Sequence, residues 1–195
     1  MASPESDEVA GTPPREAGRD EGSVMGLRDR RATGRRYQLR QKLVSVGDDY
    51  WIEDDEGDRV LRVNGKALRM RDTLDLEDTE GHQVCRIQTR VLHIRDSMAV
   101  EDPDGGRLAL VHKALISPLR ERWKVDLPDD HEWTVQGNIV DHEYEIEDGD
   151  RKIAEVSRRW FRVRDTYGVE IVPGVETALV LAVAVAIDTM AHPGR

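Results

Sequence analysis

The strongest constraint on this fold is an apolar run, Ala178 to Ile187, near the end of a 195-residue chain in which 35% of residues are charged. A helix formed by this run is apolar on every side, so it must be enclosed. Spanning a bilayer takes about 20 apolar residues, whereas Glu176 and Asp188 flank a run that is much shorter. We therefore predict a buried core helix at about 175–190, in preference to a short membrane anchor.

The N-terminal segment has a different composition. Residues 1–36 are rich in Pro, Gly, Ser, Glu and Arg and hold almost no large apolar side chain. Such a segment buries too little surface to offset the entropy of ordering, so we predict a disordered tail followed by one domain over 37–192. The tail ends in a basic cluster, which fits a solvated linker or, alternatively, a contact with a membrane surface or nucleic acid. Its members are Arg28, Arg30, Arg31, Arg35 and Arg36.

Charge and cysteine content limit the partners and the compartment. The net charge is -10, so nucleic acid is not expected as a partner. Cys85 is the single cysteine and lies in a strand-like run, which indicates a buried, inert thiol. The N-terminal segment shows no charged stretch followed by an apolar one, so we do not expect a cleaved secretion signal. We expect a monomer without a transmembrane span, in the cytoplasm, with a peripheral location at a membrane as an alternative.

An acidic, glycine-containing cluster recurs along the chain. The clusters 53–57, 77–81 and 101–105 are related and 24 residues apart, and a similar one occurs at 147–150. Each separates two runs of strand-forming residues, and Gly and Asp tolerate the positive φ of tight turns. The repeat therefore predicts a series of β-hairpins.

The runs between these turns alternate between apolar and mostly charged residues, which gives each strand one dry face and one wet face. About twelve strands fit between Tyr37 and Ile171, and they could form a sandwich or a closed barrel. The apolar helix decides between the two, because it fits a barrel lumen. The predicted fold is a mainly β, about twelve-stranded antiparallel closed barrel around a hydrophobic C-terminal helix. The predicted apolar positions are Leu74 and Leu76, Met98 and Val100, Leu108 and Leu110, Trp123, Val125 and Leu127, and Tyr144 and Ile146.

Three segments, 37–68, 69–81 and 151–190, carry a family resemblance through their order and spacing. They resemble the LURP-one-related family, which includes bacterial YxjI-like proteins, within the tubby C-terminal-like superfamily. The resemblance spans Tyr37 to Met190 and implies a twelve-stranded barrel around a hydrophobic helix. For function it implies less: tubby proteins bind phosphoinositides and related scramblases act at membranes, while the family has no known catalytic motif. No phosphoinositide-binding residue is carried over, because this chain is acidic and nearly free of lysine.

The sequence contains no recognisable catalytic or metal-binding motif. Its six histidines lie no closer than ten residues apart along the chain, so we interpret them as structural or surface residues and predict neither a metal nor a cofactor. The acidic turns do not match an EF-hand loop. We therefore predict that the protein is not an enzyme, although a site assembled from distant strands stays open as an alternative.

Two basic groups are candidate ligand-binding patches. The first combines cationic and aromatic side chains at adjacent strand positions and suits an anionic headgroup or an acidic partner. The interpretation that we favour from the sequence is a solvated face whose arginines pair with neighbouring acids. The patches consist of Arg158, Arg159, Trp160, Arg162 and Arg164, and of Arg69 and Arg71.

Asp188 follows the apolar run directly, where the helix dipole disfavours a carboxylate. We predict that it lies at the barrel mouth or meets an arginine. The function predicted from the sequence is a non-enzymatic binding or scaffold module that recognises an anionic lipid or an unknown protein partner. The alternatives are a scramblase-like, membrane-associated lipid-handling protein and an enzyme with an unrecognised site.

Overall fold

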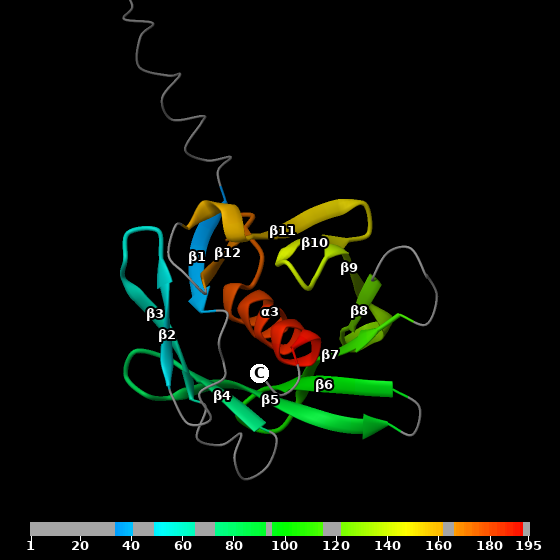
Figure 1. The fold of residues 1–195 in the computed structure, drawn as a ribbon. Helices are drawn as coiled ribbons and strands as arrows, with labels where there is room; N and C mark the ends of the chain where they lie inside the picture. The colour runs from blue at the N-terminus through cyan, green and yellow to red at the C-terminus, as the bar shows by residue number, and fades with distance from the viewer. Residues whose placement is uncertain are drawn as a thin grey trace, which may run out of the picture.

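A computed structural model describes residues 34–40, 49–64, 73–92, 95–114, 122–161 and 166–192. In these residues twelve antiparallel strands close into a barrel around a single α-helix (Figure 1). The strands have these bounds: β1 Arg35–Arg40, β2 Tyr50–Asp54, β3 Arg59–Asn64, β4 Thr73–Glu77, β5 Gln83–Leu92, β6 Arg95–Glu101, β7 Arg107–Lys113, β8 Arg122–Asp126, β9 Glu132–Asn138, β10 Glu143–Asp148, β11 Arg151–Ser157 and β12 Thr166–Ile171. The remaining elements are the 3₁₀ turns η2 (Pro128–Asp130) and η3 (Arg158–Trp160) and the helix α3 (Thr177–Ala191).

Each strand pairs with its neighbours in sequence, and β1 pairs with β12 to close the ring. The first strand begins at Arg35, ahead of the predicted domain start at Tyr37. Arg35 and Arg36 extend the ladder against Ile171 and Glu170, which is a contact that the local composition does not reveal. The rest of the predicted tail, residues 1–33, lies outside the described residues.

The acidic repeat forms hairpin turns at one end of the barrel, as predicted. Gly57, Gly81 and Gly105 have φ values of 86°, 91° and 87°, which non-glycine residues rarely adopt. In the first of these turns Asp54 Oδ1 accepts hydrogen bonds from the backbone N–H groups of Glu56 and Asp58, at 3.1 and 2.9 Å. Turn chemistry therefore accounts for both the glycine and the aspartate of the repeat.

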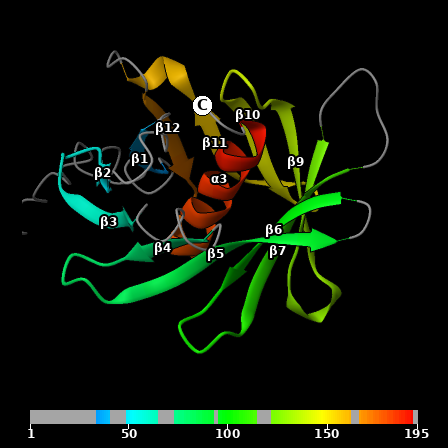
Figure 2. The same cartoon turned by 60° about the horizontal axis from the view of Figure 1, so that its bottom comes forward.

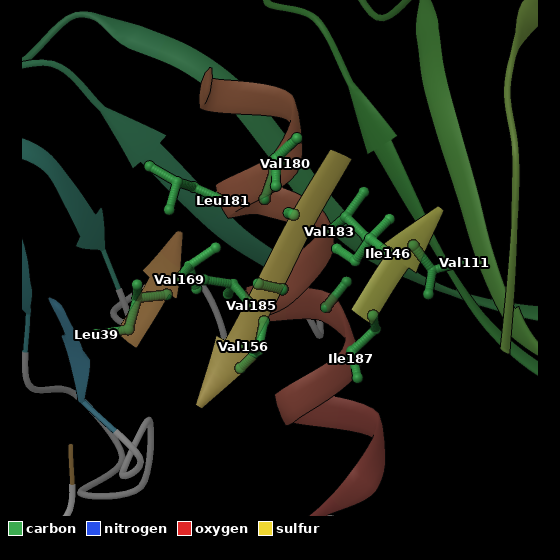
Figure 3. Close-up of a cluster of buried hydrophobic side chains, with 14 of the residues drawn as sticks. Leu39, Val111, Ile146, Val156, Val169, Val180, Leu181, Val183, Val185 and Ile187 are labelled. Carbon is green, nitrogen blue, oxygen red and sulfur yellow. The ribbon is translucent and has the colours of Figure 1, made fainter. Parts of the chain in front are cut away.

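The apolar run forms α3, which lies inside the barrel (Figures 1 and 2). Glu176 caps its N-terminus by accepting from the backbone N–H groups of Ala178 and Leu179. The helix begins two residues after the predicted start and ends one residue after the predicted end. Every residue from Val180 to Asp188 is buried, and those from Val180 to Ile187 form one hydrophobic cluster with inward-facing side chains of the strands (Figure 3).

No helix in the described part of the chain is both long enough and apolar enough to cross a bilayer. The alternative in which this helix inserts into lipid requires it to leave the barrel. In the structure its apolar side chains instead belong to one buried cluster with those of the strands, which includes Val185, Val156 and Val169 (Figure 3).

The predicted strand faces are confirmed in most strands, but the face predicted for β7 is wrong. Its buried residues are Ala109 and Val111, whereas Leu108 and Leu110 are half-buried. All four residues are apolar, so alternation within the strand does not select a face. The pairing does, because Val111 lies opposite Met98 on β6 and Val125 on β8.

The predicted burial of the single cysteine is confirmed. Cys85 is buried, and burial raises the pKa of its thiol to about 12, so it remains a protonated, weakly reactive thiol at neutral pH. The structure also places Trp123 and Trp133 in the buried core, while Trp51 is half-buried with the Arg59 guanidinium 4.9 Å from its ring centroid.

Candidate functional site

The predicted basic and aromatic patch lies at η3, between β11 and β12. Arg158, Arg159 and Trp160 were predicted at strand positions, and this is wrong, since they form a 3₁₀ turn. Local hydrogen bonds explain the turn: Ser157 Oγ accepts from the Arg159 N–H at 3.2 Å, and Glu143 Oε1 accepts from the Arg158 N–H at 3.3 Å. The chain thus leaves the sheet directly after β11.

Gly168 allows this turn to lie flat on the barrel wall. A Cβ atom at Gly168 would lie 2.7 Å from the rings of both Trp160 and Phe161, so only glycine permits the approach. The Arg36 guanidinium lies over the Trp160 ring, 4.9 Å from the ring centroid. Arg36 also forms an ion pair with Glu170 at 2.6 Å. The tertiary structure therefore adds Arg36 to the predicted patch.

We refer to Arg36, Arg158, Arg159 and Trp160 as the arginine–tryptophan patch. Arg159 is 83% exposed, and its Nε lies 3.4 Å from the Glu143 carboxylate, beyond ordinary hydrogen-bond length. The Arg158 side chain is exposed and forms no ion pair within the described part of the chain. The patch therefore holds three arginines against two nearby carboxylates, those of Glu143 and Glu170, in a protein of net charge -10.

Four predicted site residues cannot be placed. Arg162 and Arg164 of the first patch, and Arg69 and Arg71 of the second, lie outside the described residues.

An open cleft of about 690 Å³ lies next to this patch, over β9, β10 and β11. Its lining includes the carboxylates of Glu143, Glu145 and Glu155. Lys152 pairs with the latter two, at 3.2 and 2.6 Å. The cleft is acidic overall, so an anionic ligand fits the arginine–tryptophan patch better than the cleft.

A second cluster, which the sequence analysis missed, lies inside the barrel at the end of α3. Asp188 is buried and lies at the barrel mouth, which is one of the two predicted alternatives, and within the described residues it forms no ion pair with an arginine. Its Oδ1 instead lies 2.6 Å from His142 Nε2 and 3.1 Å from His192 Nδ1. The two imidazole rings are parallel, with centroids 5.1 Å apart. The sequence analysis did not predict that these two histidines lie together.

Barrel topology brings these residues together. His142 lies in the turn between β9 and β10, at the end of the barrel opposite the acidic hairpins, and it has a φ of 54°. The helix enters the lumen from the hairpin end, so its last turn reaches the opposite mouth. There His192 Nε2 lies 3.3 Å from the carbonyl oxygen of Val140.

Three buried tyrosines surround the same carboxylate: Tyr50, Tyr144 and Tyr167, at the beginnings of β2, β10 and β12. Burial, followed by the charge of Asp188, raises the pKa of each phenol well above its ordinary value. Tyr167 stacks on His142 with ring centroids 4.4 Å apart. None of the three phenol oxygens has a hydrogen-bond partner within the described chain.

Part of this cluster at the end of α3 could be predicted from the sequence. Asp188 and His192 are four residues apart, which places them on the same face of a helix. His142, however, is 46 residues from Asp188, and no local pattern links the two.

The fold and its interior define a class: a closed antiparallel barrel whose lumen is filled by its own C-terminal helix. The family model for LURP-one-related proteins matches residues 35–188, and the chain belongs to that family. Among solved structures, the X-ray structure of a protein from Arabidopsis thaliana is similar at 15% identity and a TM-score of 0.59, covering 84% of this chain and 96% of that one. That similarity supports the fold alone. No curated protein matches the chain.

Proposed function

We propose that this LURP-one-related protein is a non-enzymatic binding module that docks on an anionic lipid surface through the arginine–tryptophan patch. It acts as a monomer in the cytoplasm, peripheral to the membrane. The observation that carries the proposal is the local excess of arginines around Trp160 on an otherwise acidic protein.

The chemistry of the patch supports an anionic partner. Guanidinium groups bind phosphate in a bidentate manner, and a half-buried tryptophan such as Trp160 suits the interface between headgroups and acyl chains. The Arg158 and Arg159 side chains lose few existing interactions when they bind a phosphate, because the ion-pair contact of Arg159 with Glu143 is long. The basic residues Arg28, Arg30 and Arg31 precede β1 in the sequence and would add to the attraction.

Flotation of the full chain on liposomes tests the proposal. Neutral vesicles and vesicles containing phosphoinositide are compared at low and physiological salt. We expect binding to the anionic vesicles alone, with partial release by salt. The double variant Arg158→Gln/Arg159→Gln should bind about thirtyfold more weakly, at about 1 kcal/mol for each arginine near the surface.

Arg107→Gln/Arg151→Gln is the matched control, because it removes the same charge from exposed positions in other hairpins. Equal binding by the two double variants, or no binding of the unmodified chain, would contradict the lipid proposal and favour a protein partner. Substitution of Arg28, Arg30 and Arg31 by glutamine in the full chain separates the contribution of the N-terminal segment from that of the patch. Binding to neutral vesicles that resists salt would instead support the scramblase-like alternative.

A further inference from the structure

We propose that His142, Asp188 and His192 form a binding site for one divalent transition-metal ion, with Zn²⁺ as the best match. The site lies at the mouth of the barrel, where α3 ends. One ligand atom from each of the three residues lies within 4.8 Å of the other two. This site is independent of the arginine–tryptophan patch.

The donor set suits a borderline metal. Two imidazole nitrogens and one carboxylate oxygen are ligands that Zn²⁺ takes at about 2.0–2.2 Å, commonly with water at a fourth position. Both imidazoles already direct a nitrogen at Asp188 Oδ1, at 2.6 and 3.1 Å. A metal ion would take the place of the protons that these nitrogens donate, so binding releases protons.

The charge at this point also favours a cation. Three acceptors converge on the two imidazoles: the Asp188 carboxylate, the Asp188 carbonyl oxygen at 3.2 Å from His192 Nδ1, and the Val140 carbonyl oxygen. The end of a helix adds partial negative charge. No arginine or lysine among the described residues pairs with Asp188. A buried carboxylate in such surroundings requires a positive partner, which a metal ion supplies.

The surroundings contain the outer shell that metal sites need. Metal-bound histidines usually use their second ring nitrogen, and nearby polar groups hold the ligands or a bound water. His142 Nδ1 and the phenol oxygens of Tyr50, Tyr144 and Tyr167 are buried and have no hydrogen-bond partner within the described chain. Tyr167 fixes the His142 ring by stacking.

The metal can reach the site from solvent. The side chains of His142 and Asp188 are 1% and 2% exposed, while that of His192 is 11% exposed. His192 therefore forms the outer wall of the site, and a small rotation of its side chain would admit an ion.

The test uses the full chain after treatment with a chelator. Calorimetric titration with Zn²⁺ should show one site per chain, and Co²⁺ should give the visible absorption of a four- or five-coordinate complex. His192→Gln should weaken Zn²⁺ binding by about 100-fold or more, because losing even an outer partner costs about 10–100-fold. Tyr167→Phe should weaken it by about tenfold.

His82→Gln is the matched control. His82 is exposed, and its Nδ1 lies 3.1 Å from Asp78 and 3.6 Å from Glu80, so it offers similar groups without a built site. This variant should bind Zn²⁺ as the unmodified chain does. Circular dichroism melting of His192→Gln establishes that the variant is folded, and Asp188→Asn offers a second ligand change. Failure of the unmodified chain to bind Zn²⁺ or Co²⁺, or full binding by folded His192→Gln, would overturn the proposal and leave the cluster as a hydrogen-bonded support for the helix end.

Discussion

The lumen of this barrel has two regions with opposite chemistry. From Val180 to Ile187 the helix is surrounded by aliphatic side chains and is buried on every side. One residue further on, Asp188 meets two imidazoles, and its charge acts on three buried phenols. The same helix and the same strands thus provide an apolar interior and a polar end, and the boundary between the two lies within a single turn.

This difference shows what each region contributes to stability and to ligand binding. The apolar region stabilises the fold, because the strands and the helix each bury a face that neither can bury alone. The polar end costs free energy in desolvation, which hydrogen bonds offset only where they are complete. This polar cluster is present despite the cost of desolvation, and it lies next to the open end of the barrel. A ligand site is expected at such a place.

Removing the helix should have the largest effect. A chain that ends at Val172 loses every apolar contact that the helix makes in the lumen, where each large side chain contributes about 1.5–3 kcal/mol on burial. The sum rivals the total stability of a domain, about 5–15 kcal/mol. We expect an insoluble or molten product, measured by soluble yield and by thermal melting in circular dichroism. A soluble truncated chain that melts cooperatively would show that the barrel folds without the helix in its lumen.

Alkaline pH should destabilise the polar end next most strongly. Because the pKa values of Tyr50, Tyr144 and Tyr167 are raised in the folded state, stability is unaffected while all three phenols are protonated in both states, below about pH 10. Above that pH the unfolded chain releases protons that the folded chain retains, so the free energy of unfolding falls. The slope is about 1.4 kcal/mol per pH unit for each phenol, or about 4 kcal/mol for the three.

Denaturant unfolding at a series of pH values measures this slope. Tyr144→Phe should reduce it by about a third, and Asp188→Asn should lower the folded-state pKa values by removing the nearby charge. Cys85 adds a loss of the same sign, because its pKa is raised to about 12. A free energy of unfolding that stays level above about pH 10 would contradict the assignment of a dry, charged environment to these phenols.

A single side chain in the apolar region should have a smaller but still clear effect. Leu181→Ala leaves a cavity at a fully buried position and should lower the free energy of unfolding by about 2–5 kcal/mol. Leu179→Ala makes the same chemical change at a partly buried position of the helix and should cost about 1 kcal/mol. Urea unfolding compares the two. Equal losses would mean that the lumen is not packed more tightly than the start of the helix.

The sequence by itself determined those parts of this protein that depend on local patterns. The repeat of acidic, glycine-containing turns predicted hairpins, because only a few residue types suit a positive φ. The apolar run predicted an enclosed helix, since no exposed face was available to it. Together these patterns led to a closed barrel around a helix, and the resemblance to the LURP-one-related family agreed.

Other features were decided by the tertiary structure alone. The run 108–111 is apolar at every position, so pairing with β6 and β8 chose its buried face. Arg36 joins Trp160 only because β1 closes the ring beside β12. His142 reaches Asp188 across 46 residues of chain because the helix threads the barrel toward the turn between β9 and β10. Local propensity fixes the conformation of short segments, whereas the juxtaposition of distant residues follows from strand register and ring closure, which no local pattern encodes.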